Sequence, residues 1–253
     1  MQLGTSHGID LHVQELGSGP PVVMLHGLFG NLATWYFTTA AELSKSHRVI
    51  VYDLRGHGKS ARTLQGYDVA TMAGDLEAVV EQVAQDDVTL VGHSYGGVIA
   101  LAYAMRRPRR VRKLALVEAP LPPLDTGELW SRYTAVAKAD TESMLASLPN
   151  AVRDALVAGG RRAGRFLETV RFLSLESSLR DDLARAEMSD AALSSLACPL
   201  LAVYGSASSV RPSGDRLARV VPGATSVTLE GGHDLPQESP AALTRELVRF
   251  IDG

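Results

Sequence analysis

Residues 88–97, which read Val-Thr-Leu-Val-Gly-His-Ser-Tyr-Gly-Gly, constrain the fold more than any other stretch of the chain. The first four are apolar or β-branched and predict a buried strand that ends at Val91. The apolar residues of 98–105 predict a helix that begins just after Ser94. The glycines around Ser94 suit the sharp turn between them, because a Cβ there would collide with the strand or the helix. Ser94 is therefore expected in strained backbone geometry, with its hydroxyl pointing outward.

Apolar runs alternate with helix-like segments along most of the chain. Strands are expected over 11–16, 21–25, 48–52, 88–91, 111–117, 200–204 and 225–229, and helices over 31–43, 71–84, 98–105, 210–221 and 241–251. The first of these strands alternates polar with apolar residues, which is typical of an edge strand. Most of the others are continuous apolar runs, as in strands covered on both faces. This alternation predicts an α/β fold with a largely parallel sheet wrapped by helices on both sides.

One segment breaks the alternation. Residues 121–196 show helical periodicity and a mixture of Arg and Asp, with no convincing strand, and prolines open and close the segment. We therefore expect two parts. Residues 1–120 and 197–253 would form an α/β core, and residues 121–196 would form a helical lid over the carboxyl edge of the sheet.

Composition narrows the classes of partner. The chain has 253 residues, a net charge of −3 and a pI near 6.2, so neither a nucleic acid nor an anionic membrane is indicated as a partner. The start of the chain has no signal-peptide pattern, and no apolar run approaches the ~18 residues that cross a bilayer. The single cysteine, Cys198, is expected to be a buried structural thiol in a reducing compartment. These features favour a cytoplasmic protein, and they leave its oligomeric state open.

Three further motifs accompany Gly92-His-Ser-Tyr-Gly96. They are His-Gly-Leu-Phe-Gly at 26–30, the polar loop Asp-Leu-Arg-Gly-His-Gly-Lys-Ser at 53–60, and Gly-Gly-His-Asp-Leu-Pro at 231–236. With all four in this order, the chain resembles the α/β-hydrolase fold superfamily over nearly its whole length. The resemblance implies a mostly parallel central sheet flanked by helices, with the helical lid inserted after the strand that follows the nucleophile strand.

The resemblance also implies catalytic roles for particular residues. Ser94 would be the nucleophile, and because a serine hydroxyl is a poor nucleophile until a base accepts its proton, His233 would be that base. The backbone amides of Leu28 and Tyr95 would form the oxyanion hole, where losing one donor typically costs about 10²–10³ in rate. Phe29 is the alternative to Leu28 as the second donor.

The acid of the triad departs from the usual pattern. In much of the superfamily an aspartate stands three residues after the glycine that ends the penultimate strand, and here that position is Ser208. Some haloalkane dehalogenases and epoxide hydrolases take the acid instead from the end of the strand after the nucleophile strand, where this chain has Glu118 followed by Ala and Pro. We therefore expect Glu118 to be the acid of the triad, with Asp125 and Asp234 as the alternative acids. The other interpretation of Glu118 is an exposed loop acid or the partner of a nearby arginine in a salt bridge.

Those dehalogenases and epoxide hydrolases use an aspartate nucleophile, so Ser94 favours acyl chemistry on a small carboxylic ester or thioester that is apolar in character. No cofactor is expected, and neither metal-ligand spacing nor a nucleotide-binding glycine pattern occurs. The same Ser and His also serve lyases, cyclases, acyltransferases and cofactor-free oxygenases on this fold, and ligand-binding receptors, so these alternatives stay open. Pocket candidates, each equally compatible with a core position, are His26, Phe29, Trp35, Trp130 and Tyr133, with Tyr36, Phe166 and Phe172 as further aromatic candidates.

Overall fold

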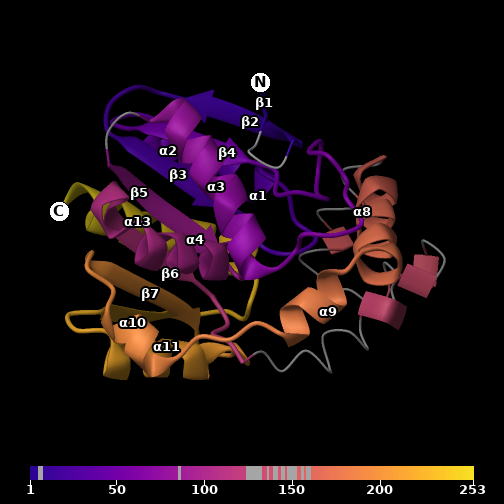
Figure 1. Ribbon diagram of the computed structural model, residues 1–253. Coiled ribbons are helices and arrows are strands. Elements are labelled where there is room, and N and C mark those ends of the chain that lie inside the picture. Colours follow the sequence, from indigo (N-terminus) through magenta and orange to yellow (C-terminus); the bar gives the residue numbers. More distant parts are fainter. Residues whose placement is uncertain are drawn as a thin grey trace.

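The computed structural model describes residues 1–4, 8–84, 87–123 and 161–253, together with a few positions between 133 and 157. One eight-stranded sheet organises these residues, in the order β1-β2-β4-β3-β5-β6-β7-β8 (Figure 1). Its strands are β1 (Gln2–Gly4), β2 (Asp10–Leu16), β3 (Pro21–Leu25), β4 (Arg48–Tyr52), β5 (Val88–His93), β6 (Val111–Val117), β7 (Leu200–Gly205) and β8 (Thr225–Leu229).

The sheet is mixed only at one edge. β1 pairs antiparallel with β2, and β2 pairs antiparallel with β4, whereas every pairing from β4 to β8 is parallel. β5 lies in the middle of the parallel part, between β3 and β6. Because the carboxyl ends of parallel strands meet at one edge of a sheet, the loops after β3, β5, β6, β7 and β8 come together there.

Helices cover both faces of the sheet. The described helices are α1 (Ala33–Tyr36), α2 (Thr39–Leu43), α3 (Val69–Val83), α4 (Tyr95–Arg106), η1 (Pro108–Arg110), α8 (Arg161–Arg171), the π-helical turn η2 (Phe172–Glu176), α9 (Leu179–Ala184), α10 (Asp190–Ser194), α11 (Arg211–Val220), α12 (Leu235–Glu238) and α13 (Pro240–Asp252). The buried side chains of α3, α4 and α11 belong to the core cluster on one face of the sheet, and those of α1, α2, α12 and α13 belong to the cluster on the other face. The α/β architecture expected from the alternating pattern is thereby confirmed.

The start of α3 illustrates how local sequence sets an element's bounds. The carboxylate of Asp68 accepts the amide of Thr71 at 2.9 Å, which caps the helix and places its first residue at Val69. Met72, Leu76 and the other buried residues of α3 recur at helical spacing and face the sheet. The sequence predicted this helix from Thr71 onward, two residues late, because its apolar periodicity begins only after the cap.

Three details of the fold predicted from the sequence are wrong. Residues 11–16 do not form an edge strand, because β1 covers β2, and a three-residue strand gives too little pattern to predict. β5 continues two residues beyond Val91, since Gly92 and His93 still pair with β6. The single helix expected over 31–43 is two short helices, α1 and α2, which are separated at Phe37 and Thr38.

Between β6 and β7, the described part of residues 121–196 contains helices and turns. α9 is tied to the core there, because the Asp182 carboxylate accepts the amide of Tyr67 at 3.1 Å, and the Ser178 amide donates to the carbonyl of Leu64 at 2.8 Å. Figure 1 shows α8 and α9 at one end of the sheet. A lid formed by residues 121–196 remains a prediction.

Arg216, on α11, holds both ends of this segment. Its guanidinium donates to the carbonyl of Pro122 at 2.7 Å and to that of Met188 at 2.6 Å, and it pairs with Asp190. We expect Arg216→Met to lower the free energy of unfolding by about 1–3 kcal/mol, because two carbonyls lose a charged donor. Urea denaturation would measure the loss, with Arg219→Met, an exposed position on the same helix, as the matched control. Equal effects of the two variants would contradict this role for Arg216.

None of the described helices combines the length and the apolar character that a bilayer crossing requires.

Candidate active site

The turn between β5 and α4 holds Ser94 in an unusual conformation. Ser94 has φ 52° and ψ −124°, a combination that costs free energy for a residue with a Cβ. The turn is tight enough to require glycine on both sides. A Cβ on Gly92 would lie 2.5 Å from the carbonyl oxygen of Gly96, and one on Gly96 would meet the carbonyl of His26. The strained turn that the sequence predicts around Ser94 is therefore present.

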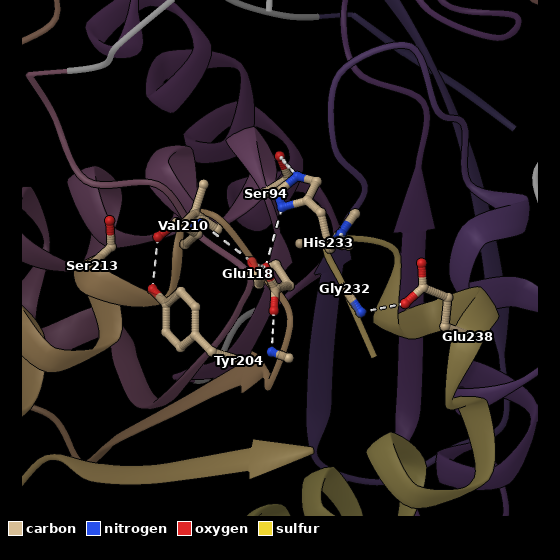
Figure 2. Close-up of polar contacts among 12 residues, drawn as sticks. Ser94, Glu118, Tyr204, Val210, Ser213, Gly232, His233 and Glu238 are labelled. Atoms are coloured by element: carbon tan, nitrogen blue, oxygen red, sulfur yellow. Dashed lines mark hydrogen bonds and ion pairs between the residues drawn. The ribbon is translucent and has the colours of Figure 1, made fainter. Parts of the chain in front are cut away.

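Ser94, His233 and Glu118 form one hydrogen-bonded line (Figure 2). The Ser94 Oγ lies 2.9 Å from Nε2 of His233, and Nδ1 of His233 lies 3.2 Å from Oε2 of Glu118. Three separate loops supply these side chains, after β5, after β8 and at the end of β6. The order of the chain along the sheet therefore brings together three residues that lie up to 139 positions apart.

The partners of His233 define where its proton lies. Glu118 is fully buried. As a carboxylate it can only accept a hydrogen bond, so we assign the ring hydrogen of His233 to Nδ1, the nitrogen that faces it. Nε2 of the neutral ring is then free to accept from the Ser94 hydroxyl. This is the arrangement that a general base needs next to a serine nucleophile.

The buried carboxylate of Glu118 has two further donors besides His233. The amide of Gly205 donates to Oε1, and the hydroxyl of Ser208 donates to Oε2. Ser208 is the position where the resemblance places the usual aspartate, and its contact with Glu118 was not foreseen. The sequence carried only an indirect signal of it, namely a small hydroxyl residue at the position where a carboxylate was expected.

The loop after β3 approaches Ser94 from the other side. A Cβ on Gly27 would lie 2.8 Å from the Cβ of Ser94, so the backbone leading to Leu28 packs directly on the serine. Among the described residues, the amides of Leu28 and Tyr95 donate to no acceptor. The amide of Phe29, the alternative donor, is already committed, because it donates to Nε2 of His57 at 3.0 Å. The geometry therefore favours Leu28 over Phe29 as the second free amide.

Backbone strain marks the same positions independently. Within the described part of the chain, the residues other than glycine with positive φ are Phe29 at 62°, Ser94 at 52° and Glu118 at 55°. All three flank the hydrogen-bonded line or belong to it. Strained backbone of this kind concentrates at sites where geometry is held for function, which supports Glu118 as part of the site.

Comparison with known proteins shows the family to which the chain belongs. The family model described as the alpha/beta hydrolase fold matches residues 20–189, more than half of the chain. The chain belongs to the α/β-hydrolase fold family. The chain is 38% identical over 116 residues to a 2-hydroxy-6-oxo-2,4-heptadienoate hydrolase from Pseudomonas putida. The aligned residues cover 44% of this chain and 42% of that relative.

Two other known proteins match a larger part of the chain. A Pseudomonas putida protein named as the dihydrolipoyllysine-residue acetyltransferase component of an acetoin cleaving system is 28% identical over 246 residues, covering 94% of this chain and 65% of that protein. The solved structure of an esterase from Exiguobacterium antarcticum is 26% identical, with a TM-score of 0.81 over 100% of this chain and 99% of that one. The chain thus spans less than two-thirds of the length of both curated Pseudomonas relatives.

Two buried histidines brace the loop after β3 in this α/β-hydrolase fold. His26 accepts the amide of Leu54 at Nε2 and lies 2.7 Å from the carbonyl of Gly27 at Nδ1. His57 accepts the amide of Phe29 in the same way and bonds the carbonyl of Arg55. Burial lowers the pKa of His26 to about 4 and that of His57 to about 3, so both rings are neutral at pH 7. His26 therefore lies beneath the loop, with both ring nitrogens bonded to backbone.

His93 supports the catalytic loop from below. Its Nε2 lies 2.9 Å from the carbonyl of His233, and because that partner can only accept, Nε2 carries the hydrogen. Burial, together with the neighbouring imidazole of His233, lowers the pKa of His93 to about 4. The contact of His93 with residue 233 connects segments 140 positions apart and has no local signal.

The aromatic pocket candidates lie in different environments. Trp35 is fully buried on the α13 side of the sheet, where its Nε1 donates to the carbonyl of Leu25 at 2.9 Å, so it offers no surface to a ligand. The ring of Phe29 stacks on that of Tyr133, with centroids 4.0 Å apart, beside the free amide of Leu28. Trp130 and the alternative acid Asp125 lie outside the described residues. The remaining aromatic candidates are a half-buried Tyr36 packed against Phe37, a partly buried Phe166, and Phe172 beneath the guanidinium of Arg62.

No group of three or more His, Cys, Asp or Glu side chains suited to a metal ion occurs within the described ranges. Burial raises the pKa of the Cys198 thiol to about 11, so it is protonated at neutral pH and poorly suited to act as a nucleophile.

Proposed function

We propose that this protein is a serine hydrolase that cleaves a small carboxylic ester or thioester through an acyl-enzyme on Ser94. The observation that carries the proposal is the continuous line from the Ser94 hydroxyl through His233 to the buried Glu118 carboxylate. Each distance is within hydrogen-bond reach, and Nε2 of His233 faces the hydroxyl whose proton it would accept.

The proposed reaction follows from these positions. Ser94 Oγ attacks the carbonyl carbon while Nε2 of His233 takes its proton, and Glu118 stabilises the imidazolium that forms. The amides of Leu28 and Tyr95 bind the oxyanion, and collapse of the tetrahedral intermediate expels the alcohol or thiol, which takes the proton back from His233. His233 then activates a water molecule, which releases the acid and restores Ser94.

The substrate side of the proposal rests on the surface beside the free amides. Tyr133, which is partly buried, packs on the buried ring of Phe29 and provides an apolar surface there, which suits a small apolar acyl or alcohol group. A lid formed by residues 121–196 would complete this surface from above. The similarity to a dienoate hydrolase and to an esterase supports hydrolysis as the reaction class.

Acyl transfer is the second candidate, because the match that covers 94% of the chain is to a protein named as an acetyltransferase component. Hydrolysis and transfer share the acyl-enzyme on Ser94 and differ only in the acceptor of its second half-reaction. Water accepts the acyl group in the first case, and a bound alcohol or thiol accepts it in the second.

The test is to mix the protein with p-nitrophenyl acetate and follow both p-nitrophenol release and intact mass. We expect a burst of p-nitrophenol with one acetyl group on the wild type, and neither on Ser94→Ala. Steady release without an added acceptor supports hydrolysis. A single burst that needs a thiol or alcohol for further turnover supports transfer. Absence of both the burst and the adduct on folded wild type contradicts the acyl-enzyme.

A further inference from the structure

The loop after β7 carries a hydroxyl that meets the acid of the proposed triad. Ser208 is only 9% exposed, and its Oγ donates to Oε2 of Glu118 while accepting the amide of Val210 at 3.3 Å. The Val210 amide therefore fixes the direction in which the Ser208 hydroxyl points. Figure 2 shows the contact that follows, between Glu118 and His233.

Glu118 needs such donors because it is a fully buried carboxylate. Within the described residues, no lysine or arginine forms an ion pair with it. Its Oε1 accepts from the amide of Gly205, and its Oε2 accepts from both Ser208 and His233. Hydrogen-bond donors thus take the place of an Arg or Lys partner, and two of the three contacts come from the last residue of β7 and the loop that follows it.

These contacts also determine how the carboxylate is oriented toward the base. Gly205 holds one end of the carboxylate on the β7 side, so rotation about the last side-chain bond would remove that contact. Ser208 holds Oε2 at the other end, beside Nδ1 of His233. The Glu118 backbone adds to this restraint, since its amide donates to the carbonyl of Val203 at 2.9 Å and its φ is 55°.

We infer that Ser208 is a positioning residue, whose hydroxyl holds Glu118 in the orientation that serves His233. This inference rests on the proposed function. The resemblance places the usual acid at position 208. In this chain the residue at that position instead donates a hydrogen bond to a carboxylate that follows the neighbouring strand, β6. Among the described residues, the Ser208 hydroxyl forms hydrogen bonds with Glu118 and Val210 and none with Ser94, so its effect on the reaction passes through Glu118.

The expected effect is on the rate of acylation and not on probe affinity. Loss of one hydrogen bond to a charged group corresponds to about 10- to 100-fold in rate. We expect Ser208→Ala to lower the maximal rate of labelling by a fluorophosphonate by that factor, with the half-saturating probe concentration unchanged. Ser208→Thr keeps the hydroxyl and is expected to restore most of the rate. Ser209→Ala, the same change at the exposed neighbouring serine, is the matched control and should label at the wild-type rate.

A second pair of variants separates positioning from general loosening of the loop. Ser208→Cys is nearly isosteric with a much weaker donor, so it is expected to fold and still label slowly. In a Glu118→Gln background, Ser208→Ala is expected to cause little further loss, because the carboxylate through which it acts is already gone.

The outcomes distinguish the inference from the function on which it rests. Labelling of wild type at Ser94, with slow labelling of Ser208→Ala and Ser208→Cys, supports both. Normal labelling of these two variants overturns the inference and leaves the serine hydrolase intact. A full additional loss in the Glu118→Gln background also overturns it. Failure of folded wild type to label contradicts the function and the inference together.

Discussion

Replacing Glu118 by Gln is expected to lower the rate of ester acylation by about 10⁴, the typical cost of losing the acid of a serine triad. The amide is nearly isosteric, so the loss follows from chemistry and not from packing. Three donors, on Gly205, Ser208 and His233, point at the two carboxylate oxygens, and an amide offers only one oxygen to them. An NH₂ facing His233 would also force its proton onto Nε2, where it opposes the Ser94 hydroxyl.

Single-turnover release of p-nitrophenol from p-nitrophenyl acetate measures this loss. Asp234→Asn is the informative companion, because Asp234 was the alternative acid and lies next to His233 in the chain. Its carboxylate makes no hydrogen bond to the His233 ring in the described structure, so that variant should stay within about tenfold of wild type. The reverse result, a large loss for Asp234→Asn and a small one for Glu118→Gln, would assign the acid to Asp234.

Acidification from pH 7.5 to pH 5 is expected to remove about 6 kcal/mol from the free energy of unfolding. His26, His57 and His93 have pKa values lowered to about 4, 3 and 4, mainly by burial. In the unfolded chain they titrate near pH 6.5, so below that pH the unfolded state binds more protons and stability falls. Each histidine costs about 2 kcal/mol by pH 5, and the sum is comparable to the whole stability of a typical domain.

Burial is the main cause of these low pKa values, and in His26 and His57 one ring nitrogen also accepts a backbone amide. Nε2 of His57 accepts the Phe29 amide, and a proton there would set two donors against each other. Urea denaturation at the two pH values measures the change. His57→Gln can accept the same amide without titrating, so its loss between pH 7.5 and pH 5 should be about 2 kcal/mol smaller. Equal stability of wild type at both pH values would contradict this account.

The sequence predicts the fold well because its signals are local and repeated. Apolar runs predict the parallel strands, and Gly92 and Gly96 predict the sharp turn, since close approach of backbone at those positions excludes any side chain. Elements without a local pattern were missed. β1 has only three residues, and the break between α1 and α2 at Phe37 and Thr38 has no glycine or proline to mark it.

The sequence predicts the role of a site residue only where that residue belongs to a recognisable motif. Ser94 and His233 stand in such motifs, and Glu118 was predicted by resemblance at the end of an apolar strand. Ser208 and His93 act through contacts with residues 90 and 140 positions away, and these depend on how the loops after β5, β7 and β8 pack at the edge of the sheet. A single sequence holds no local signal for such contacts. Trp35 is the opposite case. It follows the 26–30 motif closely in the chain and was therefore a pocket candidate, but its side chain lies in the core.

The central claim is that His233 and Glu118 activate Ser94 as a nucleophile. Intact-mass labelling with a fluorophosphonate tests it most directly, on wild type, Ser94→Ala and Glu118→Gln. The account predicts one adduct on wild type, none on Ser94→Ala and slow labelling of Glu118→Gln. Folded wild type that takes up no probe, or Ser94→Ala that labels as fast as wild type, would contradict it.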